Sequence, residues 1–75
     1  MKKIVEVTAK FELGGRVMPL EIIWEDGRRF EIDRVLEIRR AASLKAGGTG
    51  IRYKCMICGH ERYLFLEENS SWFVE

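Results

Sequence analysis

The segment KAGGTGIRY, residues 45–53, combines a lysine, three glycines and a basic stretch, which are residue types that bind phosphate. Successive backbone N–H groups in a glycine-rich turn can form a nest for an anion. The strongest phosphate motif, G-x-x-x-x-G-K-[ST], is absent, because Lys45 precedes the glycines and no helix is expected after them. A P-loop is therefore not expected, whereas a weaker anion-binding loop and a plain connecting loop both stay open.

Basic side chains flank this loop on both sides. Residues 28–54 carry eight Lys or Arg against three Asp or Glu, although the formal net charge of the whole chain is only +1. A nearly neutral total can thus hide one basic face and one acidic face, and a basic face is typical of proteins that contact polyanions such as RNA. Whether the basic residues converge on one face depends on the fold. Tyr53 stands between two basic residues, where an exposed ring would stack on a base. The predicted nucleic-acid or anion-binding residues are Arg39, Arg40, Lys45, Arg52, Tyr53 and Lys54.

The candidate metal ligands are Cys55, Cys58 and His60 in the pattern CMICGH. This pattern resembles one knuckle of a zinc ribbon, but a structural zinc needs four ligands and the chain has no second pair of cysteines. A separation of three also places Cys55 and Cys58 on opposite faces of a strand. The three residues are therefore a weak alternative metal site, and the sequence predicts no metal and no cofactor.

Residues for catalysis are scarce. The only histidine is expected in a hairpin turn, and the serines are expected in loops without a nucleophile elbow. A C-x-x-C redox pair usually lies at a helix N-terminus in a βαβ unit, which this sequence does not predict. We therefore expect no catalytic residue and no enzyme.

Strands must position these candidates. From residue 5 to residue 13 apolar and polar residues alternate strictly, which predicts a half-buried strand. Asp26-Gly27 predicts a type I′ hairpin turn and Gly59-His60 a type II′ turn. Further strands are expected over residues 17–25, 29–39, 51–57, 61–66 and 72–74.

Residues 34–46 allow two interpretations. Alternation favours one long bent strand with a bulge near Arg34-Val35, followed by a loop over residues 40–50 with room for one short helical turn in residues 40–46. The alternative is a helix with Asp33 as its N-cap and Gly47 as its C-cap.

Five or six short strands in 75 residues predict an all-β fold in a single domain, residues 1–75. A sandwich usually needs about seven strands in about 100 residues. We therefore expect a small SH3-like antiparallel barrel, because closure removes exposed sheet edges.

The composition indicates a cytoplasmic protein without a membrane segment. The longest apolar runs are about three residues, whereas a membrane helix needs about 18. Charged residues interrupt the N-terminal segment where a signal peptide would need an apolar core. Two cysteines are too few for a disulfide scaffold.

The runs WEDGRRFEIDRV and AASLKAGGTGIRY, with the terminal WFVE, resemble a group of short, uncharacterised bacterial proteins. The resemblance covers most of the chain. It implies a small β fold and a cytoplasmic bacterial origin, and it implies no activity, ligand or functional residue.

The function that the sequence predicts is a binding module that contacts RNA or another polyanion through the basic middle segment. The alternative is a protein-interaction or assembly module, in which Trp24, Trp72 or an open strand edge docks a peptide or a second copy of the chain.

Overall fold

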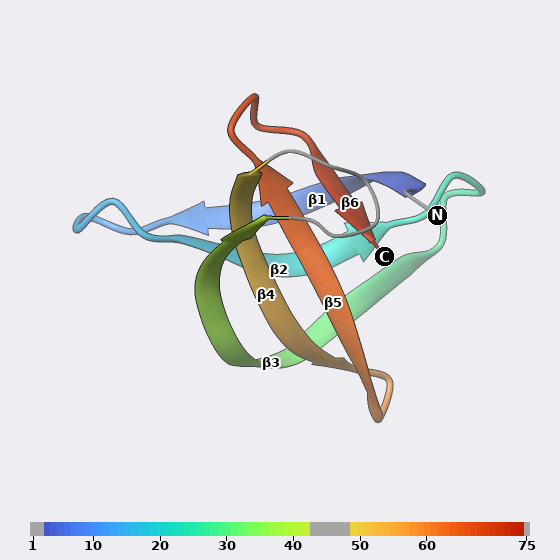
Figure 1. Ribbon diagram of the computed structural model, residues 1–75. Coiled ribbons are helices and arrows are strands. Elements are labelled where there is room, and N and C mark those ends of the chain that lie inside the picture. The colour runs from blue at the N-terminus through green and yellow to red at the C-terminus, as the bar shows by residue number, and fades with distance from the viewer. Residues whose placement is uncertain (1–2, 43–48, 75) are drawn as a thin grey trace.

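The computed structural model describes residues 3–42 and 49–74, and these residues form a closed barrel of six antiparallel strands (Figure 1). Each strand pairs with the next one along the chain, and β6 closes the barrel by pairing with β1. The predicted all-β antiparallel barrel is confirmed, and the predicted strand ends agree to within three residues. The strands are β1 Lys3–Phe11, β2 Val17–Ile23, β3 Arg29–Ala42, β4 Thr49–Ile57, β5 His60–Glu67 and β6 Trp72–Val74.

The long strand β3 bends across the barrel. Its register with β4 shifts between Ile32 and Arg34 and again between Val35 and Glu37, so the predicted bulge is confirmed. The alternative helix is wrong for residues 34–42, and so is the helical turn for residues 40–42, because Ala42 still pairs with Thr49. Loss of alternation after residue 39 suggested a loop, but the ladder continues there through backbone pairing. The rest of that helical turn, residues 43–46, lies outside the described residues.

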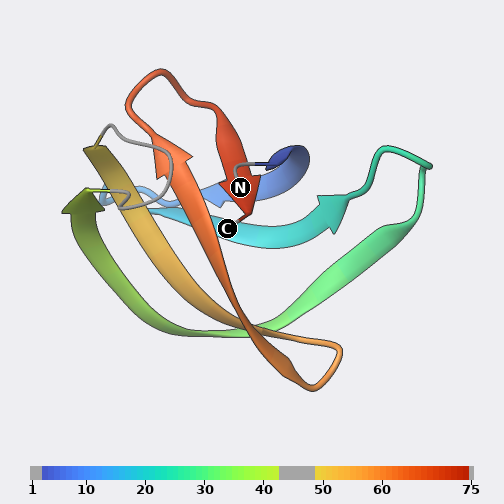
Figure 2. The same ribbon diagram turned by 45° about the vertical axis from the view of Figure 1, so that its right-hand side comes forward.

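β3 changes its partner along its length. From Arg29 to Glu31 it pairs with β2, and from Ile32 onward it pairs with β4. Figure 2 shows β2 and β3 diverging from their shared turn. The barrel is therefore tightly laddered across β3, β4 and β5 and loosely joined between β2 and β3.

Three of the hairpins share one turn geometry, in which the fourth residue has a left-handed backbone. These residues are Gly15, Gly27 and Ser70, with φ angles of 93°, 88° and 70°. In each turn the first backbone N–H donates to the carbonyl four residues on, and its carbonyl accepts from the N–H three residues on. This pattern is a type I turn followed by a G1 bulge.

Two predicted turn types are therefore wrong. Asp26 does not have positive φ, so the β2–β3 turn is not type I′. Its carboxylate instead accepts the N–H of Arg28 at 3.0 Å, an Asx contact that suits the type I geometry. The β4–β5 turn is made by Cys58 and Gly59, which both have positive φ as a type I′ turn requires, and not by Gly59-His60.

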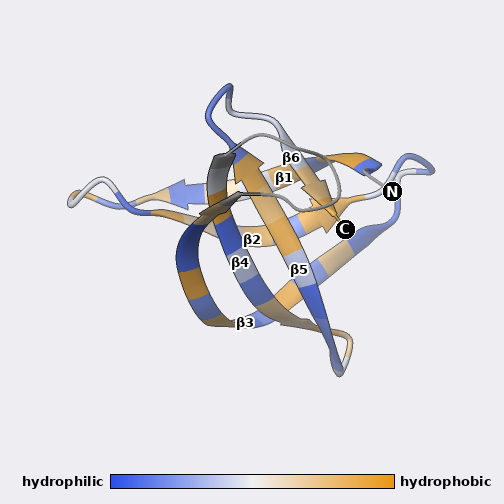
Figure 3. Ribbon diagram, in the orientation of Figure 1, coloured by the Kyte–Doolittle hydropathy of each residue, from blue (hydrophilic) through white to orange (hydrophobic). Residues whose placement is uncertain are grey.

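The core fills the barrel interior. Its fully buried members are Tyr53, Cys55 and Leu64, and Trp72 packs with its ring centroid 5.4 Å from that of Tyr53. Apolar and polar bands alternate along β3 and β4 in Figure 3, as expected for strands with one face inside. A second aromatic pair, Phe65 and Phe73, is also fully buried, and its rings stack at 4.9 Å on the face of β5 and β6 opposite to Leu64. No helix in the described part of the chain is long and apolar enough to cross a membrane.

Candidate nucleic-acid interface

Basic side chains from two neighbouring strands meet on the outside of the barrel. Arg52 and Lys54 alternate with the buried Tyr53 and Cys55 on β4, so they point outward. Arg39 on β3 lies directly opposite Arg52 in the ladder. We call this surface the basic face, and its members are Arg34, Arg39, Arg52, Lys54 and Tyr63.

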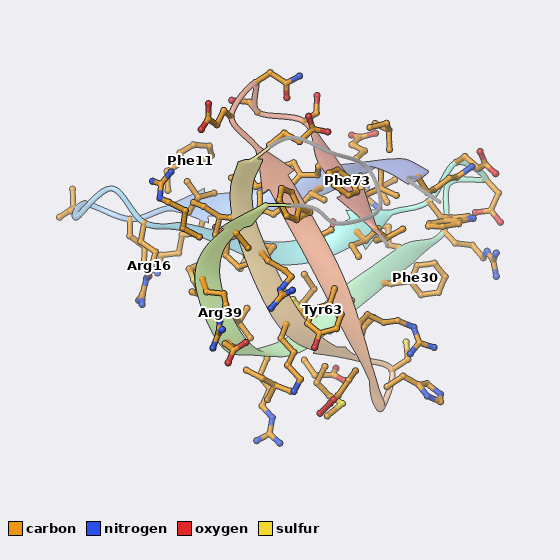
Figure 4. The ribbon with its side chains drawn as sticks, in the orientation of Figure 1. Phe11, Arg16, Phe30, Arg39, Tyr63 and Phe73 are labelled. Atoms are coloured by element: carbon orange, nitrogen blue, oxygen red, sulfur yellow. The ribbon has the colours of Figure 1, made fainter. Side chains whose placement is uncertain are left out.

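An aromatic ring completes the basic face. Tyr63 on β5 pairs with Lys54, and Figure 4 places Arg39 and Tyr63 on either side of β4. The guanidinium carbon of Arg52 lies 5.0 Å from the Tyr63 ring centroid, and the tyrosine is 40% exposed. Arg52 thereby holds one face of the ring through a cation–π contact.

Two carboxylates partly neutralise these cations. Arg39 Nη2 lies 3.2 Å from Glu37 Oε2, and Lys54 Nζ lies 3.6 Å from Glu61 Oε2. Exposed pairs of this kind contribute only about 0–1 kcal/mol, so a phosphate can replace the carboxylate at little cost. Within the described residues, Arg34 and Arg52 make no ion pair, and the basic face therefore keeps a net positive charge.

The predicted role of Tyr53 in stacking is wrong. Tyr53 is 1% exposed, and its hydroxyl donates a hydrogen bond of 2.5 Å to the carbonyl oxygen of Val17. Burial raises the pKa of Tyr53, the nearby Cys55 adds to the increase, and Arg16 opposes it. Since Val17 opens β2, this bond joins β4 to the part of β2 that β3 does not reach. The ring stabilises the fold and is closed to a base.

The other predicted residues do not join the basic face. Arg40 pairs with Ile51 and so projects from the opposite face of β3 to Arg39, where it lines a shallow hollow with Glu67 and Glu68. Lys45 lies outside the described residues. Of the predicted binding residues, the fold brings Arg39, Arg52 and Lys54 to one face.

The sequence suggested that Gly50 forms part of a phosphate nest, but in the structure this glycine allows close packing of β4 against β5. It lies inside β4, between Ala41 on β3 and Glu67 on β5. A Cβ atom at this position would lie 2.1 Å from the carbonyl oxygen of Leu66 and 2.9 Å from the Phe65 ring. Glycine is required here because the strand on one side approaches so closely.

The cysteines do not converge on a shared ligand. Cys55 is buried in the core, and Cys58 is exposed in the β4–β5 turn next to His60. Burial raises the pKa of the Cys55 thiol to about 11, which disfavours the thiolate that binds metal. In the described part of the chain no three His, Cys, Asp or Glu side chains are grouped so that they could hold a metal ion.

Sequence reasoning missed Tyr63 and Arg34 because it misplaced the β4–β5 turn and assigned no pairing between β3 and β4. With a turn at Gly59-His60, Lys54 would face Phe65, whereas the turn at Cys58-Gly59 makes Lys54 face Tyr63. The double register shift in β3 then brings Arg34 opposite Met56 on the outer face. The apolar alternation of Ile51, Tyr53, Cys55 and Ile57 was a signal for the burial of Tyr53.

Comparison with protein-family models, curated proteins and solved structures finds no match to this chain. The candidate interface therefore depends on the geometry of its own residues.

Proposed function

We propose that the protein is a small β-barrel binding module that contacts single-stranded RNA through the basic face. The observation that carries the proposal is the cross-strand pair of Arg39 and Arg52 beside the half-exposed ring of Tyr63. Guanidinium groups bind phosphates, and an aromatic ring at the same surface stacks on a base. A polyanion without bases would use only the charges, so the ring favours RNA.

Salt dependence gives the first test. Release of counterions by three bound cations, Arg39, Arg52 and Lys54, predicts a slope of about −2 for single-stranded RNA, or about a 20-fold loss of affinity between 50 and 200 mM salt. The measurement is fluorescence anisotropy with a labelled RNA 12-mer of mixed sequence. Absence of binding at 50 mM salt, or equal affinity at both salt concentrations, contradicts the proposal.

Variants of the basic face give the second test. Arg52→Gln should weaken RNA binding and make the salt slope shallower by about 0.7, because one phosphate contact is lost. Tyr63→Ala should weaken RNA binding by about 1 kcal/mol or more at every salt concentration, because stacking does not depend on counterions. Lys10→Gln, which removes a charge from the outside of β1, is the matched control and should leave both quantities unchanged.

Heparin separates RNA from polyanions in general. If Tyr63→Ala leaves RNA binding intact while Arg52→Gln weakens both RNA and heparin, the protein binds polyanions by charge alone. That result would contradict the proposed preference for RNA.

A protein-interaction function is a second candidate, because one edge of β3 is open. Beyond Glu31, no other described strand pairs with the β3 edge that faces away from β4. Leu36 and Ile38 on this segment are 39% and 37% exposed. Such an edge can pair with a strand of a second copy of the chain. Sedimentation velocity should then detect a dimer that Ile38→Lys abolishes, whereas a monomer at all concentrations argues against it.

A further inference from the structure

A cavity separate from the outward arginines of the basic face opens at the end of the barrel that carries the β2–β3 and β4–β5 turns. Its volume is about 440 Å³, within the range of about 300–1,000 Å³ that small-molecule sites occupy. Two of its lining residues, Ile22 and Phe30, are partners in the short ladder between β2 and β3 next to their turn. The lining residues come from five strands and one turn, so the tertiary fold alone creates this cavity.

Apolar side chains, including two aromatic rings, form the walls of the cavity. Ile22 and Ile57 are buried, and the rings of Trp24 and Phe30 are half-buried. Figure 4 shows Phe30 on β3 on the same side of the barrel as Tyr63 on β5, which also lines the cavity. Exposed ring surface of this kind suits a planar apolar group, because aromatic pairs prefer stacked or edge-to-face contact.

The polar groups of the cavity are cationic. Arg28 and Arg62 line it, and among residues 3–42 and 49–74 no Asp or Glu does. The Arg28 Nε donates to Asp26 at 2.6 Å, and its guanidinium carbon lies 5.4 Å from the Phe30 ring centroid. Arg28 is therefore partly neutralised and is held over the aromatic wall.

Arg62 is the cation with donors to spare. Its Nη1 donates to the neighbouring carbonyl oxygen of Glu61 at 2.8 Å, and it makes no ion pair with a described carboxylate. A guanidinium has five N–H donors, and its planar fork matches the two oxygens of a carboxylate. One anionic group at the rim could accept hydrogen bonds from the remaining N–H donors of Arg62.

We propose that this cavity binds a small aromatic carboxylate. The planar body lies against Trp24 and Phe30, and the carboxylate accepts hydrogen bonds from Arg62, with Arg28 adding positive charge at the same rim. The two arginines, with no acidic residue among the described lining residues, favour an anion over a cationic or neutral ligand. Tyr63 borders both this cavity and the basic face, so the two proposals are separated at Arg62, which lines the cavity and is not a member of the basic face.

Isothermal titration calorimetry with 2-naphthoate and its neutral analogue 2-naphthalenemethanol tests the proposal. 2-Naphthoate should bind saturably with one molecule per chain, and more tightly than the alcohol. Arg62→Gln should weaken 2-naphthoate about tenfold, as expected for a lost charge-assisted hydrogen bond, and leave the alcohol unchanged. Lys10→Gln removes another exposed cation, from the outside of β1, and should change neither affinity.

A second measurement locates the ligand. The indole N–H resonance of Trp24 should shift on addition of 2-naphthoate, and assignment uses the Trp24→Phe variant. No saturable binding at millimolar concentration overturns the proposal. So does equal affinity for the acid and the alcohol, or an Arg62→Gln variant that binds 2-naphthoate as the parent does.

Discussion

The two sides of the barrel are built differently. Across β3, β4 and β5 the ladder runs from Ile32 to Ala42 and from Ile57 to Gly50, with two register shifts in β3, and it fixes the paired residues as inward-facing or outward-facing. Between β2 and β3 it covers only Arg29 to Glu31. The continuous side displays Arg39, Arg52 and Lys54 on its exterior, whereas the cavity lies at the end of the barrel that carries the β2–β3 and β4–β5 turns. The regular ladder therefore presents a charged surface, and the turn end presents a pocket.

The largest expected loss of stability comes from a substitution at Gly50, where β4 and β5 approach closely on the continuous side. Gly50→Ala should lower the free energy of unfolding by about 3 kcal/mol, because the new Cβ meets the backbone oxygen of Leu66 and β5 must shift. Urea denaturation measures this loss. Gly14→Ala is the matched control, since Gly14 has open space around it, and it should change stability by less than about 0.5 kcal/mol. Equal effects of the two substitutions would refute the packing role of Gly50.

The next largest loss of stability comes from removing the hydrogen bond between Tyr53 and Val17, which joins the two sides. Tyr53→Phe should cost about 1–2 kcal/mol, because the carbonyl of Val17 loses its hydrogen-bond donor. Tyr63→Phe removes a hydroxyl from an exposed ring and should leave stability unchanged. Thermal unfolding followed by circular dichroism compares the variants, and a Tyr53→Phe protein as stable as the parent would show that the bond is dispensable.

Alkaline pH should lower the stability of the protein, because two buried groups of β4, Cys55 and Tyr53, lose their protons. Burial raises the pKa of Cys55 from 9.0 to about 11 and also raises the pKa of Tyr53, so the folded state favours their neutral forms. This contribution is fully present below the unfolded cysteine pKa and is lost as pH rises toward 11. Stability should therefore fall by about 1 kcal/mol from Cys55 alone by about pH 10. Urea titrations at several pH values should give a shallower decline for Cys55→Ala, and an unchanged decline would exclude this thiol as a cause.

The smallest expected effect distinguishes the three related turns. Ser70 occupies the left-handed position that glycine fills in the other two turns, at φ 70°. Ser70→Gly should stabilise the protein by about 0.5 kcal/mol, because glycine adopts this backbone without steric cost. Gly27→Ser should cost about 1 kcal/mol for the same reason, and differential scanning calorimetry resolves both shifts. A destabilising Ser70→Gly would mean that the serine side chain stabilises the turn.

Much of the fold could be predicted because it depends on patterns within one segment. Alternation over residues 5–13 and 29–39 and the glycines at the turns predicted the strands and their antiparallel order. The turn types were less predictable, because Asp26-Gly27 suits two geometries and the Asx contact to Arg28 selects one of them. The end of β3 was missed because its pairing partner, rather than its own sequence, keeps it extended.

The candidate site was also predictable only in part. Composition and alternation were enough to predict that residues 28–54 are basic and that Arg52 and Lys54 lie on one face of a strand. The folded barrel was needed to show that Arg39 lies opposite Arg52, that Tyr63 and not Tyr53 is the exposed ring, and that Arg28 and Arg62 line one cavity. The reason is physical: alternation assigns a face within each strand, whereas register and barrel closure decide which side chains of different strands become neighbours.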